Sequence, residues 1–165
     1  MKPDTAPSVG KDLDARERRA VQDVAEYILF RVGRMTAMKL QKLVYYTQAW
    51  SLAWDDQPLF LDVLEAWANG PVAPALYELH RAEFWVLSVG GDHSLLNRRQ
   101  RQVVDAVLLT YGGLSPETLI ELTHQEDPWR AARAGVEPGS RSNAIIGWRS
   151  LRDFYRTTEI DVEAL

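Results

Sequence analysis

The stretch from Met38 to Trp54 constrains the fold more than any other part of this sequence, because it has a helical pattern with almost no polar face. With successive residues about 100 degrees apart, its apolar and aromatic side chains point in nearly every direction. A helix that is apolar nearly all round is typically buried between other elements. We therefore expect the central helix of a small domain here, with Thr36 as its N-cap.

The composition indicates a cytoplasmic globular protein. The chain has 165 residues, of which 46% are hydrophobic, so it is long enough for one domain with its own core. It has no cysteine, which excludes a disulfide framework, a zinc-thiolate site and a thiol nucleophile and agrees with a reducing compartment. No apolar run approaches the roughly 20 residues that span a bilayer, and we expect no membrane partner.

The remaining patterns predict further helices around this one. Apolar residues at helical spacing, with caps, prolines and glycines at the boundaries, indicate helices near residues 14–33, 75–85, 94–111, 115–124, 127–133 and 143–155. Leu59-Phe60 and the stretch from Val63 to Trp67 predict two short strands that form a hairpin. We expect a mainly α fold: a single compact helical domain over residues 14–158 around the central buried helix, with one small β-hairpin, a flexible N-terminal tail at 1–13 and a C-terminal tail at 159–165.

Charge is unevenly distributed along the chain. The net charge of −4 argues against a dedicated nucleic-acid-binding domain, and we expect no nucleic-acid partner. Acids are dense near the middle, and arginines are frequent in the later part. This pattern fits either solvated helix faces or a charged docking face for a protein partner. The residues are the acids Asp55, Asp56, Asp62 and Glu65 and the arginines Arg98, Arg99, Arg101, Arg130, Arg133, Arg141, Arg149, Arg152 and Arg156.

The sequence contains no strong signature of a metal, cofactor or catalytic site. Its three histidines are scattered, and the only local cluster of ligand types, residues 124–127, consists of chain neighbours that do not converge on one ion. The paired glycines lack the features of a phosphate-binding loop. We expect Asp127 to cap a helix at Pro128 and His124 to make a structural hydrogen bond near Trp129. An alternative is a small hydrolase-like or ligand-binding enzyme that uses His124 and nearby acids.

Lys42 is a polar residue in a helix otherwise short of polar groups. In a strand beside this helix, Glu65 and Trp67 would point to the same side. Lys42 could therefore form a structural ion pair with Glu65 that fixes the hairpin to the helix. The other interpretation is a hot spot for binding a partner protein, since tryptophan, tyrosine and arginine dominate such spots.

The same residues carry a family resemblance. The run from Leu40 to Trp50, followed by Pro58-Leu59-Phe60, Glu65-Ala66-Trp67 and Gly70-Pro71-Val72, resembles the Panacea domain, the SocA-like antitoxin family. Pro74, Tyr77 and a later block, with Leu122-Thr123-His124 and Asp127-Pro128-Trp129, extend it. Two positions depart from the family's pattern: Ala49 replaces a usual glycine and Ala68 a usual aromatic residue.

The resemblance implies a non-enzymatic role. Members are antitoxins of two-gene, type II-like toxin-antitoxin systems, often carried by phages or mobile elements, and they bind and neutralise a cognate protein toxin. Some relatives are proteolytic adaptors that deliver the toxin to a ClpXP-type protease. The family pairs with many unrelated toxins. The motif residues, with structural or partner-binding roles, are Lys39, Leu40, Gln41, Lys42, Leu43, Tyr45, Tyr46, Gln48, Trp50, Glu65, Trp67, Gly70, Pro71, Val72, Tyr77, His124, Asp127 and Trp129.

Overall fold

A computed structural model describes residues 19–158 and confirms a mainly α fold with small β elements. The predicted tails at 1–13 and 159–165 lie outside the described residues. None of the described helices is long and apolar enough to cross a membrane. In chain order the elements are α2 (Val21–Val32), β1 (Met35–Thr36), α3 (Ala37–Asp55), β2 (Glu65–Trp67), β3 (Gly70–Val72), α4 (Pro74–His80), β4 (Trp85–Val86), the 3-10 helix η1 (His93–Leu95), α5 (Arg98–Tyr111), α6 (Pro116–Gln125), α7 (Asp127–Ala132) and α8 (Trp148–Arg156).

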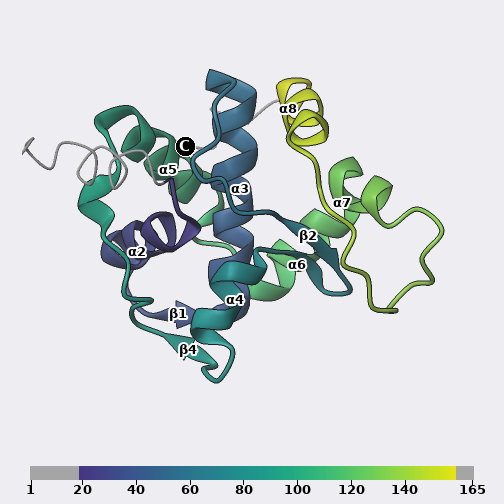
Figure 1. The fold of residues 1–165 in the computed structure, drawn as a ribbon, viewed down its shortest axis with the longest axis horizontal. Coiled ribbons are helices and arrows are strands. Elements are labelled where there is room, and N and C mark those ends of the chain that lie inside the picture. Colours follow the sequence, from purple (N-terminus) through teal and green to yellow (C-terminus); the bar gives the residue numbers. More distant parts are fainter. Residues whose placement is uncertain (1–18, 159–165) are drawn as a thin grey trace, which may run out of the picture.

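Helix α3 is the predicted central helix. Every residue from 40 to 53 is buried, and α2, α5, α6 and α8 pack around it. In Figure 1, α2 and α5 lie on one side of α3 and α8 lies on the other. Thr36 caps the helix as predicted, because its side chain accepts a hydrogen bond from the Lys39 amide at 3.1 Å. The burial ends before Trp54, which the helical pattern placed in the core but which is 40% exposed.

The hairpin forms later in the chain than predicted. Glu65–Trp67 pairs with Gly70–Val72, and Leu59-Phe60 is not a strand. A strand through Pro71 was not predicted, and proline cannot donate a backbone hydrogen bond. However, Pro71 lies opposite Ala66, whose amide donates outward to the Ala144 carbonyl at 2.8 Å. At this position of the ladder the backbone amides point away from the partner strand, so the hairpin loses no hydrogen bond because Pro71 lacks an N–H group.

A second two-stranded sheet was not predicted. Met35 pairs with Val86 and Thr36 with Trp85, and the Ala37 amide donates to the Phe84 carbonyl at 2.9 Å. The prediction of a helix reaching residue 85 was therefore wrong, and α4 ends at His80. Strands of two residues are too short to show an alternating pattern, which explains why the sequence did not reveal them.

Three other helix boundaries differ from the predicted ones. Helix α5 begins after Asn97, which forms a capping box with Gln100, rather than at Ser94. Helix α8 begins at Trp148 instead of 143, because residues 144–146 run extended beside the hairpin. Helix α2 begins at Val21, and the predicted start at residues 14–18 lies outside the described range. The predicted start of α6 is confirmed, with Ser115 as its cap.

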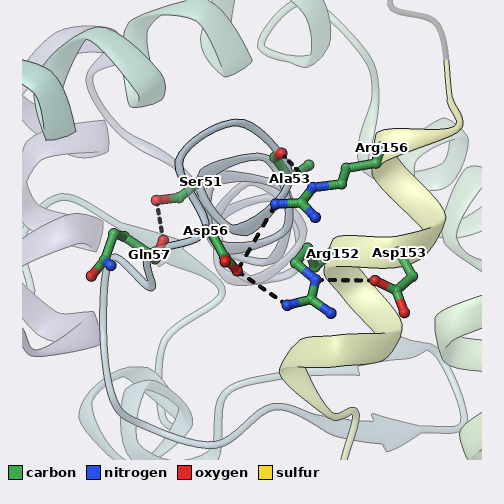
Figure 2. Close-up of polar contacts among 7 residues, drawn as sticks. All are labelled: Ser51, Ala53, Asp56, Gln57, Arg152, Asp153 and Arg156. Carbon is green, nitrogen blue, oxygen red and sulfur yellow. Dashed lines mark hydrogen bonds and ion pairs between the residues drawn. The ribbon is translucent and has the colours of Figure 1, made fainter.

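Acidic residues at the C-terminal end of α3 form ion pairs with arginines of α5 and α8. Figure 2 shows Asp56, which ends the helix in a left-handed conformation, together with Arg152 and Arg156 of α8. The Arg152 guanidinium lies 3.3 Å from the Asp56 carboxylate, and Arg99 of α5 pairs with Asp55 at 2.8 Å. Several late arginines thus pair with the middle acids across elements. Because the pairs are partly exposed, each stabilises the fold only slightly.

Candidate functional site

A cleft of about 800 Å³ opens beside the first half of α3. The β2–β3 hairpin, α4 and the loop at 141–143 form its other sides. Six of its sixteen lining residues are apolar or aromatic and ten are polar or charged, a mixture that can hold a ligand and fix its orientation. The lining residues are Ala37, Met38, Gln41, Lys42, Glu65, Trp67, Ala68, Asn69, Val72, Tyr77, His80, Arg81, Glu83, Arg141, Ser142 and Asn143.

Gln41 fixes the start of α4 at one edge of this cleft. Its amide oxygen accepts from the Ala73 amide at 2.9 Å, and its amide nitrogen donates to the Ala73 carbonyl at 3.3 Å. The same nitrogen lies 2.9 Å from Nε2 of His80. Gln48, two helical turns later, bonds the backbone of Leu59 and Phe60 in the same way. Both glutamines therefore hold neighbouring loops against α3.

Lys42 lies at the floor of the cleft and is fully buried. Its ammonium donates to the Pro71 carbonyl at 2.9 Å, and burial lowers the pKa of Lys42 to about 7. The ion pair considered for Lys42 and Glu65 does not form. Instead the Glu65 carboxylate accepts a hydrogen bond from the Trp67 indole at 2.7 Å.

Gly70 gives the Lys42 side chain the space it occupies. A β-carbon at position 70 would lie 2.7 Å from Cε of Lys42 and 2.9 Å from the Thr123 hydroxyl. Its φ of +105° is also a conformation that favours glycine. The Gly-Pro pair of the motif thus serves two purposes: glycine admits the lysine, and Pro71 supplies the carbonyl that it binds.

Aromatic side chains form one wall of the cleft. The rings of Trp67 and Tyr77 meet edge to face with centroids 5.0 Å apart, and Tyr77 meets His80 at 5.6 Å. Behind this wall, the Trp129 indole donates to the Trp67 carbonyl at 2.9 Å. The hairpin is thereby attached to α7, and the orientation of the wall is fixed.

His124 packs behind the hairpin rather than on an open surface. As predicted, it lies beside Trp129, on which it stacks at 4.1 Å, and it bonds the backbone of Ala68. Burial lowers the pKa of His124, and the positive charges of Lys42 and Arg133 lower it further. No acid or hydroxyl partner for its ring occurs among residues 19–158, so the geometry gives the enzyme hypothesis no support. Within the same range no group of acidic or histidine side chains could hold a metal ion.

The capping role predicted for Asp127 was wrong. Helix α7 begins at Asp127, and the residue before it, Glu126, is in the N-cap position without a side-chain capping bond. Asp127 is exposed. The proline at the second position starts the helix without a capping bond, because its ring already holds the backbone angle that a helix needs.

Glu126 belongs to a buried polar cluster that the sequence did not predict. The Tyr46 hydroxyl donates to its carboxylate, and the ring of Tyr46 stacks on Tyr111 at 4.0 Å. Two further pairs surround them: Tyr45 with Tyr155 at 3.1 Å and Trp50 with Tyr111 at 3.0 Å. Burial raises the pKa of Glu126 to about 6. These aromatic motif residues therefore join α3 to α5, α6 and α8.

Arg133 holds the loop that completes the cleft, and sequence reasoning treated it only as one of many late arginines. It is buried, and its guanidinium donates to the Ala66 carbonyl at 2.9 Å and to the Ser140 carbonyl at 2.7 Å. It also lies over the Trp129 ring at 5.1 Å. The two terminal nitrogens of its planar guanidinium point in fixed directions, and each bonds a different backbone segment.

The structure thus divides the motif residues between the cleft and the core. Those that line the cleft come from α3, the hairpin and α4. In the core, Tyr45, Tyr46 and Trp50 contact α5 and α8, and Gln48 holds residues 59–60. Lys39 is half-buried, and it belongs neither to the cleft lining nor to the buried core. The cleft residues are Gln41, Lys42, Glu65, Trp67, Val72 and Tyr77, with Gly70 and Pro71 behind Lys42; the core residues are Leu40, Leu43, Tyr45, Tyr46, Gln48 and Trp50.

The fold and the cleft define a small helical domain with an open cleft beside its central helix. The family described as Antitoxin SocA-like, Panacea domain, matches residues 40–130, more than half of the chain. Antitoxin SocA of Caulobacter vibrioides (strain NA1000 / CB15N) is 27% identical over 178 aligned residues, which cover 94% of this chain and 91% of that protein. No solved structure matches. The chain therefore belongs to the SocA-like antitoxin family with a Panacea domain.

Proposed function

We propose that this protein is an antitoxin that binds and neutralises a cognate protein toxin in the cytoplasm. Membership of an antitoxin family supports the role. The observation that carries the binding mechanism is the cleft, because six motif residues from α3, the hairpin and α4 line it. Its mixture of aromatic walls and polar groups is suited to holding a segment of another protein.

A finer version of the proposal concerns the fate of the toxin. The resemblance implies that some relatives hand their toxins to a ClpXP-type protease. Direct neutralisation needs only an occupied cleft, whereas an adaptor must also leave a second surface for the protease. Toxin half-life in cells, with and without this protein and with and without active protease, separates the two. An unchanged half-life means direct neutralisation.

Co-expression with the product of the neighbouring gene tests the function itself. We expect the gene product alone to arrest growth, and we expect growth to recover and a complex to co-purify when the full chain is present. A matched control is the variant Arg99→Met, which changes an exposed residue on α5 far from the cleft lining. If the wild-type chain neither restored growth nor bound the gene product, the proposed function would be wrong.

A further inference from the structure

Strand β4 has an open edge that carries large exposed apolar side chains. Phe84, Trp85 and Leu87 are 72%, 52% and 70% exposed. Among residues 19–158 this strand pairs with β1 alone, so one of its two edges is open. In Figure 1, β4 lies at the lower margin of the molecule. An exposed apolar strand edge is a template for pairing with another chain, and its side chains mark an interaction surface.

The backbone of Trp85 faces outward from this edge. The Ala37 amide donates to the Phe84 carbonyl, so the next pair, Thr36 with Trp85, has its N–H and C=O groups directed away from each other. No partner for the backbone amide or carbonyl of Trp85 occurs in the described range. An extended chain segment satisfies both groups at once, because its own backbone presents a donor and an acceptor at alternate residues.

Two opposite charges flank the open edge. Arg34 is exposed, and its guanidinium lies over the Trp85 ring at 5.0 Å. Glu83 is exposed two residues before Trp85. Within residues 19–158 neither side chain forms an ion pair. Because β1 runs antiparallel to β4, Arg34 lies at the Leu87 end of the strand and Glu83 lies at the opposite end.

We propose that two copies of this chain pair antiparallel through β4, about a two-fold axis at Trp85, to form one four-stranded sheet. The axis reverses the second strand, so Glu83 of each copy comes to the end where Arg34 of the other copy lies. Trp85 pairs with Trp85 of the second copy through two backbone hydrogen bonds, and the exposed apolar side chains cover one another. Aromatic and opposite-charge pairs across strands stabilise such a sheet.

The position of the charges favours a second copy over an unrelated strand. In a two-fold interface the same surface occurs on both partners, so it must be complementary to itself. The β4 edge meets this condition, because one surface supplies the positive charge, the negative charge and the outward backbone groups. The inference is independent of the proposed function, since the dimer forms without a toxin.

Sedimentation equilibrium of the purified full chain, from micromolar to submillimolar concentration, tests the pairing. We expect the wild type to approach twice the mass of one chain. Trp85→Ser should weaken the dimer on the order of 10-fold or more, with an unchanged circular dichroism spectrum. Leu109→Ser, which changes a 72% exposed apolar residue of α5, is the matched control and should dimerise as the wild type does. A wild-type chain that stayed monomeric throughout would overturn the inference.

A charge exchange tests the two-fold arrangement without changing any apolar residue. Arg34→Glu alone and Glu83→Arg alone each bring like charges together in their own dimers, so each variant should associate more weakly than the wild type. Mixed in equal amounts, the two variants should form heterodimers, because both contacts then join opposite charges. If the mixture associated no better than either variant alone, the proposed pairing would be wrong.

A different occupant of the edge gives a different result. If a toxin strand covers β4 instead, the free chain is monomeric and Trp85→Ser weakens only the complex with the neighbouring gene product. That outcome overturns the self-pairing and leaves the antitoxin function intact. Conversely, a chain that dimerises as described but neither binds nor neutralises the gene product keeps this inference and loses the proposed function.

Discussion

Lys42 is the single residue on which the cleft depends most. Its stem runs beside Gly70, and its ammonium reaches a backbone carbonyl without any acid nearby in the described chain. Burial of a charge without an ion partner destabilises the folded state. The bond to the Pro71 carbonyl, which holds the hairpin to α3, offsets part of this cost.

Lys42→Met should make the protein more stable at neutral and slightly acidic pH. The folded-state pKa of Lys42 is about 7, against 10.5 ordinarily. Between these values the unfolded chain holds the proton and the folded chain does not, so the wild-type free energy of unfolding rises with pH by up to about 1.4 kcal/mol per unit. We expect the variant to exceed the wild type by roughly 2 kcal/mol at pH 6.

Urea unfolding of both proteins at pH 6, 8 and 10 measures this difference. The advantage of the variant should shrink as pH rises and reverse by pH 10, because the folded wild-type protein no longer carries the buried charge. Lys39→Met should not reproduce this trend. A constant difference across the range would mean that Lys42 is not the group that titrates.

Glu126→Gln should change stability in a lower pH window. Burial raises the pKa of Glu126 to about 6, although the bonds from Tyr46 and Tyr155 oppose the shift. Between the ordinary value of 4.5 and 6, the folded chain holds more protons than the unfolded chain. The stabilisation from this group is therefore present below pH 4.5 and lost as pH rises through 6.

Glu126→Gln should lack this pH-dependent contribution to the free energy of unfolding, because glutamine does not titrate. Its amide oxygen can still accept from the Tyr46 hydroxyl, so the fold should be kept. The wild-type minus variant difference in free energy of unfolding should fall between pH 4.5 and 6 and stay flat above. Glu121→Gln, an exposed change on α6, provides the control. A flat difference throughout would show that Glu126 titrates normally.

At the scale of elements, the cleft is assembled by contacts between segments distant in sequence. The hairpin is held by Lys42 of α3 on one side and by Trp129 and Arg133 of α7 on the other. Arg133 is the one buried arginine among the described residues, and it bonds the Ser140 carbonyl in the loop that follows α7. Arg133 thus holds one end of the loop beside the cleft, and the backbone bonds of residues 144 and 146 to the hairpin segment hold the other.

Arg133→Met should loosen that loop while α3 stays intact. The change leaves the Ala66 and Ser140 carbonyls without their donor, which costs about 2–3 kcal/mol. Hydrogen exchange should become faster at residues 134–147 and stay slow in α3. Arg133→Lys should restore only part of the protection from exchange, because the single nitrogen of an ammonium cannot occupy the positions of both guanidinium nitrogens. Exposed Arg130→Met is the control, and equal exchange in all variants would contradict the role of Arg133.

The sequence predicted α3, its cap and the existence of a hairpin because these depend on local pattern. The helix has apolar residues all round, and Thr36 is a standard cap. Local pattern could not show that Pro71 pairs with Ala66, since an isolated Gly-Pro indicates a turn. It also could not reveal the two-residue sheet of Met35 with Val86, where pairing depends on residues 50 apart. Arg133 was missed because burial of an arginine depends on carbonyls supplied by other segments.

At the scale of the whole molecule, α8 returns the end of the described chain to the central helix. Tyr155 bonds Tyr45 and packs on Trp50, and Arg156 donates to the Ala53 carbonyl at 3.1 Å (Figure 2). The core is therefore shared by elements from both ends of the described range. We infer that the described residues fold as one cooperative unit.

Thermal unfolding tests whether the described residues unfold in one cooperative transition. Far-ultraviolet circular dichroism, which follows the helices, and tryptophan fluorescence, which follows Trp50 and its neighbours, should give the same midpoint. Tyr155→Ala should lower both midpoints together, because it removes a fully buried ring that contacts three aromatic residues of α3 and its surroundings. Separate midpoints for the two signals would show that α8 is an independent unit.

The central claim, that the cleft receives the toxin, is tested most directly by hydrogen exchange of the chain with and without the bound gene product. Binding in the cleft predicts slower exchange of backbone amides in residues 65–72 and 141–143 and at the start of α4. The amides near Asp55 at the end of α3 and near Arg99 in α5 should change little. Protection confined to α5 and α8, with the hairpin and the 141–143 loop exchanging as in the free protein, would contradict the claim.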